Sequence, residues 1–270
     1  MIFKSFKNLV DDIMDVIPLL PRDIGTVVGV PRSGMIPASV LSTMLGARLA
    51  VLGDTSTCYG GWRIDNLIKC RGDKILLVDD SSFTGNSILQ AKKILDKKCT
   101  TLVIYVTSSS KNKLDIYSKI TPPDRIFQWN FLAKSLTHTW CFDMDGVICT
   151  DPDHFDDDGT GYEKALINAK PLYLPQTKIK AIVTNRIERW RKITMDWLSK
   201  HEVDYDELIM QPFETAVERR QKSNSAVFKS EHYLKYTNSK LFIESSEWQA
   251  KKINELTGKH VLCTENFIIY

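Results

Sequence analysis

The sequence has no paired-cysteine motif, no internal repeat and no low-complexity run. Its six cysteines are scattered, and none forms a C-x-x-C pair or lies at zinc-finger spacing with a histidine: Cys58, Cys70, Cys99, Cys141, Cys149 and Cys263. Isolated thiols of this kind are typical of a reducing compartment. We therefore expect reduced cysteines in a cytoplasmic protein.

A large charge excess and a long apolar run are missing as well. The 36 lysines and arginines barely exceed the 33 aspartates and glutamates, so the net charge of +3 gives no electrostatic argument for a nucleic-acid partner. The first twenty residues lack the apolar core of a signal peptide, and no stretch approaches the ~20 apolar residues of a membrane span. We expect a soluble chain without a nucleic-acid partner. The composition does not exclude small charged ligands, and it does not exclude peripheral contact with the inner face of the cytoplasmic membrane.

The 270 residues do contain two successive series of short apolar runs with helical patterns between them. After a helical pattern at Phe6–Ile17, the first series has strands expected at Thr26–Val30, Arg48–Leu52, Lys74–Val78 and Thr101–Val106, and helices at Met35–Leu45 and Ser87–Leu95. The second runs from a strand at Trp140–Phe142 to one at His260–Leu262. This alternation predicts an α/β protein of two domains, residues 1–136 and 137–270, each a mostly parallel sheet flanked by helices.

Residues that follow an apolar strand deserve attention because ligands bind beyond the carboxyl ends of parallel strands. After the run Ile75–Val78 come two carboxylates and then a Thr-Gly turn before a helix. A helix start offers unpaired backbone N–H groups to a phosphate, and Gly85 permits close approach. Asp79 and Asp80, one sugar length away, would accept hydrogen bonds from a cis-diol. The pattern predicts a ribose 5-phosphate site.

This stretch resembles the phosphoribosyl diphosphate (PRPP) signature of type I phosphoribosyltransferases. The run Val27–Gly34, a strand followed by a Pro/Gly loop, is similar to the diphosphate-binding loop of that family. The resemblance implies a type I phosphoribosyltransferase fold, Mg²⁺ on the diphosphate, and a PRPP site made of Arg32, Ser33, Gly34, Asp79, Asp80, Ser81, Ser82, Phe83, Thr84, Gly85, Asn86 and Ser87. It also suggests Lys69 and Arg71 for a loop that closes over the reacting centre.

Two residues, Ser82 and Phe83, depart from the family pattern. Phe83 occupies a place where members that use nucleobases often carry an acid that handles a proton on the base. A phenyl ring has no such proton to exchange. This departure argues against nucleobase chemistry.

A second pair of carboxylates ends the strand at Phe142. Asp143 and Asp145 lie two residues apart, so both side chains can point to the same side of the strand. One carboxylate can then act as a nucleophile and the other can donate and accept protons. The string Asp143-Met144-Asp145-Gly146-Val147 closely resembles motif I of haloacid dehalogenase-like phosphatases. In that family the first aspartate is phosphorylated and the second is the acid and base. The resemblance implies these roles for Asp143 and Asp145 and a Rossmann-like fold for the second domain.

Three further residues complete the family's set. Thr184 ends an apolar run and takes the place of the hydroxyl that orients the phosphate. Glu244 takes the place of the acidic metal ligand, with Glu247 as an alternative. Lys229 has the best position for the lysine that offsets the phosphoryl charge, with Lys222 and Lys235 as alternatives. The implied catalytic residues are Asp143, Asp145, Thr184 and Lys229, and the implied Mg²⁺ ligands are Asp143, Asp145 and Glu244.

The combination of the two sites bears on the product. A phosphoribosyltransferase leaves a 5-phosphate that nucleotide synthesis retains, so an attached phosphatase favours a product that must lose it. The whole chain resembles fused phosphoribosyltransferase–phosphatase proteins of bacterial polysaccharide synthesis, such as O-antigen or capsule. There, 5-phosphoribofuranose passes from PRPP to a lipid-linked glycan acceptor and is then dephosphorylated. Two alternatives remain: an orotate-like nucleobase phosphoribosyltransferase with a nucleotidase, and a non-enzymatic PRPP-binding regulator. The oligomeric state is left open.

Overall fold

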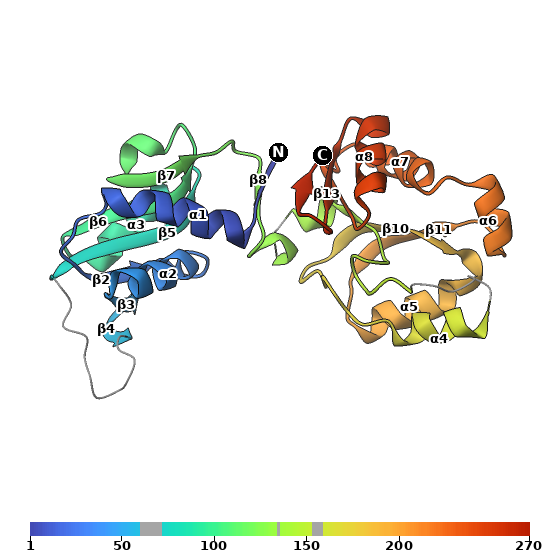
Figure 1. The fold of residues 1–270 in the computed structure, drawn as a ribbon, viewed down its shortest axis with the longest axis horizontal. Coiled ribbons are helices and arrows are strands. Elements are labelled where there is room, and N and C mark those ends of the chain that lie inside the picture. The colour runs from blue at the N-terminus through green and yellow to red at the C-terminus, as the bar shows by residue number, and fades with distance from the viewer. Residues whose placement is uncertain (60–71, 134–135, 153–158) are drawn as a thin grey trace. The chain divides into compact units, whose positions relative to one another are not determined.

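The computed structural model describes residues 1–59, 72–133, 136–152 and 159–270. The chain divides into two compact units, Met1–Trp129 and Asn130–Tyr270. The sequence pattern predicts this boundary after residue 136. Each unit contains a mostly parallel sheet flanked by helices, so the predicted α/β class is confirmed (Figure 1). Within the described residues, no helix is long and apolar enough to cross a membrane.

The first unit is built on a six-stranded sheet in the order β4-β3-β2-β5-β6-β7, parallel except for the antiparallel pair β3–β4. Its strands are β2 (Ile24–Gly29), β3 (Arg48–Val51), β4 (Asp54–Tyr59), β5 (Lys74–Ser82), β6 (Cys99–Val106) and β7 (Ile116–Ile120). Its helices are α1 (Phe6–Val16), α2 (Met35–Leu45) and α3 (Asn86–Leu95). A separate parallel pair joins β1 (Ile2–Lys4) to β8 (Arg125–Phe127).

Side chains of the central strands alternate between the two faces of this sheet, and helices bury both faces. On β5, Leu76 packs in one cluster with Ile13 of α1 and Leu41 of α2. The next residue, Leu77, packs in another cluster with Ile88 of α3. This two-residue period is what an extended strand imposes. It explains why these runs are apolar throughout: both faces are covered.

The switch point of the first sheet lies between β2 and β5. Strands β3 and β4 follow β2 on one side, and the chain then crosses to β5, β6 and β7 on the other. The loops after β2 and β5 therefore emerge side by side, as the hydrogen bond from Val30 N to Val78 O (2.9 Å) shows. In open α/β sheets this is where ligands bind.

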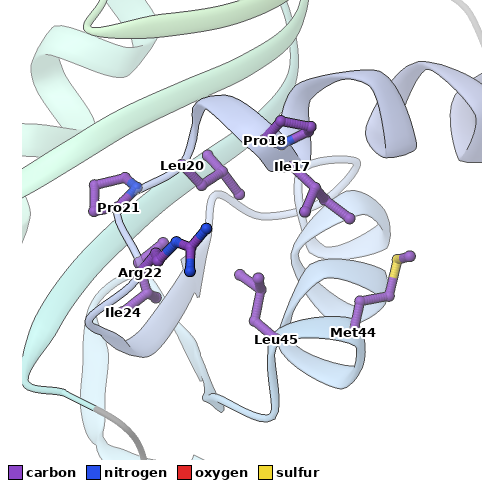
Figure 2. A pocket seen from close by; sticks show the side chains of 8 residues that line it. All are labelled: Ile17, Pro18, Leu20, Pro21, Arg22, Ile24, Met44 and Leu45. Carbon is purple, nitrogen blue, oxygen red and sulfur yellow. The ribbon is translucent and has the colours of Figure 1, made fainter.

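An apolar pocket of the first unit lies at the opposite end of the sheet. Its volume is about 410 Å³, and Figure 2 shows Ile17, Leu20, Ile24 and Leu45 around it, with Arg22 at its side. Ile24 begins β2 and Leu45 ends α2, so this pocket adjoins the amino ends of the strands. It is separate from the loops that carry the PRPP-like signature.

The second unit has a six-stranded sheet in the order β11-β10-β9-β12-β13-β14, parallel except for β13–β14. Its strands are β9 (Cys141–Phe142), β10 (Ile179–Ile187), β11 (Tyr205–Gln211), β12 (Leu241–Glu244), β13 (His260–Cys263) and β14 (Ile268–Ile269). Its helices are α4 (Thr160–Asn168), α5 (Arg191–Lys200), α6 (Ala216–Lys222), α7 (Ser225–Lys235) and α8 (Glu247–Thr257).

The short strand β9 is the switch point of this second sheet. Strands β10 and β11 lie on one side of β9, and β12, β13 and β14 lie on the other. Cys141 and Phe142 pair with Ala181 and Ile182 of β10 and with Phe242 and Ile243 of β12. The residues directly after Phe142 thus emerge between the carboxyl ends of two neighbouring strands.

Candidate active sites

The acidic pair of the first unit lies inside β5 rather than after it. Backbone pairing with β6 continues through Asp79, opposite Val103, and Ser81, opposite Tyr105. Asp79 is 7% exposed and Asp80 is 4% exposed. Oδ1 of Asp79 accepts a hydrogen bond from the Asp80 backbone N (2.9 Å), and Oδ2 of Asp80 accepts one from Trp129 Nε1 (2.7 Å). The two carboxylates are therefore held on a rigid strand.

Burial dominates the electrostatics of this pair. It raises the pKa of Asp79 to about 8, and the neighbouring carboxylate of Asp80 acts in the same direction. The pKa of Asp80 is also raised by burial, against the opposing effects of the Trp129 hydrogen bond and the Arg125 charge. Removal from water penalises two adjacent negative charges. Hydroxyl donors or a cation at this site would relieve that penalty.

The Thr-Gly turn forms a loop immediately before α3. Gly85 has φ +82°, a left-handed conformation, and its N–H donates to Ser82 Oγ (3.0 Å). The exposed Thr84, Asn86 and Ser87 border the amino terminus of the helix. Backbone N–H groups at such a helix start suit an anion.

A cation that the sequence analysis did not select joins this loop. Lys113 Nζ donates to the backbone carbonyl of Thr84 (2.7 Å), and its side chain lies against Gly85. Lys113 belongs to the turn after β6, 29 residues from Thr84, so nothing in the local pattern connects the two. Its ammonium lies next to the predicted phosphate position.

The loop after β2 lies against the acidic pair. A Cβ atom on Gly34 would come within 2.9 Å of Asp79 Oδ1 and 2.5 Å of the Val30 carbonyl, so only glycine permits this approach. Arg32 is exposed and Ser33 is partly exposed at the start of α2. The structure thus brings the Arg32–Gly34 loop and the acidic pair together, while Lys69 and Arg71 lie outside the described residues.

The second unit contains a buried ion-pair cluster at the end of β9. Lys229 of α7, 1% exposed, donates from Nζ to Asp143 Oδ2 (2.7 Å), Glu244 Oε2 (2.7 Å) and Gln249 Oε1 (3.0 Å). Backbone N–H groups of Met144 and Ser245 bind the remaining oxygens of the two carboxylates. Of the three lysines considered, the structure places Lys229 here. Lys222 pairs with Glu218 on the surface, and Lys235 contacts His232.

The charges of this cluster depend on one another. The two carboxylates raise the pKa of Lys229 despite its burial, so the ammonium stays protonated. Burial raises the pKa of Asp143, and Glu244 acts in the same direction, while Lys229 opposes both. The cation thus offsets the cost of placing two carboxylates in the interior.

Asp145 has a partner that the sequence analysis missed. Arg186, at the far end of β10, donates from Nε to both oxygens of Asp145 (3.1 and 3.0 Å) and from Nη2 to Oδ1 (2.6 Å). The Arg186 side chain is fully buried, and it also donates to Thr194 Oγ1 and to Cys149 Sγ. This fork fixes the orientation of the Asp145 carboxylate.

A polar cavity of about 320 Å³ adjoins these residues. Its lining includes Asp143, Asp145, Asp151, Tyr162, Asn185, Arg186, Arg219, Ser225, Ser245, Ser246 and Gln249. Thr184 is fully buried and accepts a hydrogen bond from the Arg186 backbone N (3.2 Å). Its neighbour Asn185, and not Thr184, faces the cavity. The amino termini of α7 and α8 contribute Ser225 and Ser246, so backbone dipoles and Arg219 favour an anionic ligand here.

The donor set next to Asp143 matches the chemistry of Mg²⁺ in part. Asp143 and Glu244 provide carboxylate oxygens on adjacent strands, and Mg²⁺ is commonly held by one or two carboxylates plus water. Asp145 directs its side chain to Arg186, and its backbone carbonyl accepts a hydrogen bond from Ser245 Oγ (3.1 Å). Among the described residues, no three His, Cys, Asp or Glu side chains are grouped closely enough to hold a metal ion by themselves.

The chain therefore presents two α/β units, each with a polar site where its strand order reverses. No protein-family model matches the sequence. A stretch of 97 residues is 35% identical to the orotate phosphoribosyltransferase of Methanopyrus kandleri, covering 35% of this chain and 49% of that protein. The chain thus spans about half the length of the curated relative it matches.

Solved structures of two named phosphoribosyltransferases are similar over about half of the chain. The purine phosphoribosyltransferase of Pyrococcus horikoshii is 19% identical, with a TM-score of 0.36, over 48% of this chain and 94% of that one. The xanthine-guanine-hypoxanthine phosphoribosyltransferase of Helicobacter pylori is 24% identical, with a TM-score of 0.38, over 47% and 91%.

Proposed function

We propose that the chain is a bifunctional enzyme that transfers 5-phosphoribofuranose from PRPP to a glycan hydroxyl and then removes the 5-phosphate. In the first step the acceptor oxygen bonds to C1, the bond from C1 to diphosphate breaks, and diphosphate leaves. The hydroxyl proton passes to solvent or to a base that we do not assign. In the second step Asp143 attacks phosphorus and the ribose O5 leaves with a proton from Asp145. Water then gives a proton back to Asp145 and hydrolyses the aspartyl phosphate to inorganic phosphate, which frees Asp143.

The observation that carries the proposal is the presence of both sites in one chain. At one switch point, the Asp79–Asp80 pair, the Thr84–Gly85 turn and the Arg32 loop lie together. The 35% identity over 97 residues to an orotate phosphoribosyltransferase supports PRPP-dependent transfer. Asp143, Lys229 and Glu244 form the ion-pair cluster at the other switch point. A phosphatase paired with a transferase is useful only when the transferred phosphate is temporary.

The polar cavity beside Asp143 supports a sugar phosphate as the phosphatase substrate. Asn185, Gln249, Ser225 and Arg219 offer amide, hydroxyl and guanidinium groups to hydroxyls and phosphate oxygens. A lipid-linked glycan would bring the enzyme to the inner face of the cytoplasmic membrane as a peripheral protein. The chemistry of both steps favours Mg²⁺: on the diphosphate in the first, and held by Asp143 and Glu244 in the second, where it would neutralise phosphoryl charge.

The test supplies PRPP, Mg²⁺ and a panel of glycan acceptors to the wild type and to Asp143→Asn, and follows products by mass. The wild type should add one pentose, and the variant should accumulate a product heavier by one phosphate. A variant that yields the same product as the wild type would contradict the two-step scheme. Asp79→Asn with Asp80→Asn should abolish transfer yet leave hydrolysis of a pre-made phosphorylated product intact.

A second candidate is transfer to a nucleobase, because the curated relative is named for orotate. Phe83 argues against it, since this residue is 57% exposed in the loop and its side chain carries no acid. Free bases, orotate included, therefore belong in the acceptor panel. Turnover of orotate with no turnover of glycans would replace the first proposal with the second, and PRPP binding without any turnover would favour a regulator.

A further inference from the structure

Trp129 makes a polar contact inside the PRPP-like site that no part of the sequence pattern predicts. Its indole Nε1 donates to Asp80 Oδ2 at 2.7 Å, across 49 residues of sequence. The acceptor is 4% exposed, so little water competes for it. A hydrogen bond to an ionised carboxylate in such surroundings is stronger than one at the surface.

The indole itself is held in place by aromatic rings. It stacks on Phe127 with ring centroids 4.8 Å apart and an interplanar angle of 13°, and Tyr105 lies in the same stack at 6.1 Å. Phe6, the first residue of α1, contacts the indole at 5.8 Å. The ring therefore cannot turn its N–H away without breaking these contacts. An indole N–H is a donor only, so Asp80 is bound as an acceptor.

The contact fixes one of two carboxylate oxygens and so sets the direction of the other. Asp80 shares the strand face of Leu76 and Val78, which pack toward α1, whereas Asp79 is the residue that approaches Gly34. The two acids thus have different supports. Asp79 is braced by the backbone of Asp80 and the Gly34 loop, and Asp80 is braced by Trp129.

We propose that Trp129 is a positioning residue that orients Asp80 toward a ribose hydroxyl of PRPP. The inference rests on the proposed PRPP site and adds a residue to it. Trp129 does not touch the reacting atoms. Trp129 acts through Asp80. Replacing Trp129 should therefore weaken PRPP binding only in a chain that retains the Asp80 carboxylate.

The experiment compares Trp129→Phe with Trp197→Phe in the full chain. Trp197 is a matched control, because its Nε1 also donates one buried hydrogen bond, to the Ala169 carbonyl (2.9 Å), but in the second unit. Calorimetric titration with Mg²⁺-PRPP should give a Kd about tenfold higher for Trp129→Phe, as expected for loss of one hydrogen bond to a charged group. Trp197→Phe should stay within about twofold of the wild type.

A double-mutant cycle separates positioning from general stability. In an Asp80→Ala background, which removes the acceptor, Trp129→Phe should cause no further loss of PRPP affinity. Trp129→His, which keeps a ring N–H, should recover part of the affinity and serves as the readout if Trp129→Phe does not fold. Wild-type-like affinity in Trp129→Phe, or additive losses in the cycle, would overturn the inference. A wild type that binds no PRPP would instead overturn the proposed function itself.

Discussion

Arg186 and Asp145 form a bidentate pair in which three hydrogen bonds of 2.6 to 3.1 Å join a fully buried guanidinium to a carboxylate that is 18% exposed. The planar fork matches the carboxylate geometry in a way that a lysine cannot. The carboxylate that we propose for proton transfer is thus held at a fixed angle beside Asp143.

We expect Arg186→Lys to lower the phosphatase kcat by at least about tenfold, because a point charge keeps the attraction but loses the fork that sets the angle. Steady-state hydrolysis of a sugar phosphate measures this. Arg191→Lys is the control, since Arg191 makes a similar fork to Glu188 near the surface. Equal activities in the two variants would show that the orientation of Asp145 is unimportant.

Lys229→Met should destabilise the second unit strongly. The change leaves Asp143 and Glu244 buried without their shared cation, a situation that costs about 3–5 kcal/mol. Urea unfolding measures the loss. Lys222→Met removes an exposed i,i+4 pair and should change stability by less than about 0.5 kcal/mol. A comparably small effect at Lys229 would mean that the two carboxylates do not depend on it.

The acidic pair predicts a loss of stability as the pH rises from about 4 to about 8. Because the pKa of Asp79 is raised to about 8, the folded state binds more protons than the unfolded state between pH 4 and pH 8. The contribution of Asp79 to the free energy of unfolding is fully present below the ordinary pKa of 3.8, and it is lost as the pH rises through about 8. Asp79→Asn should flatten the fall of the melting temperature between pH 4 and pH 8. The exposed Asp124→Asn should leave it unchanged, and an unchanged slope in Asp79→Asn would contradict the assignment.

Gly146 should tolerate no side chain. Its φ is +74°, and an added Cβ would come within 2.5 Å of the Ser245 side chain. Gly258 has a similar φ of +65° with open space around it, so Gly258→Ala measures the backbone strain alone. Gly146→Ala should cost at least about 1 kcal/mol more in thermal or urea unfolding. Equal losses would show that Ser245 moves aside without cost.

The sequence predicted the repeating α/β pattern because buried parallel strands are apolar on both faces and their helices carry clear periodicity. The expected helix Met35–Leu45 has the bounds of α2, whereas the expected strand Lys74–Val78 is shorter than β5. In the sequence, the two carboxylates Asp79 and Asp80 follow an apolar run and so suggest that the strand has ended. Backbone pairing with β6 continues through them, since it does not depend on side-chain polarity.

The partners of the acids could not be predicted, because each lies far away along the chain. Arg186 meets Asp145 across 41 residues, and Trp129 meets Asp80 across 49. No periodic pattern links positions at such separations, and only the sheet order brings them together. Thr184 shows the converse problem. Its place in a motif suggested that it faces the cavity, but Thr184 is fully buried and Asn185 lines the cavity, at a point where the register of β10 with β11 is irregular.

The position of Trp129 limits where the chain can be divided for separate study. It is the last residue of the first unit and lies two residues after the end of β8, which pairs with the amino-terminal strand β1. A fragment that stops at the Pro122-Pro123 turn would lose β8, the aromatic stack and the donor to Asp80 together. A fragment intended to measure PRPP binding on its own therefore has to extend through Trp129, and one that ends earlier would give a falsely weak affinity.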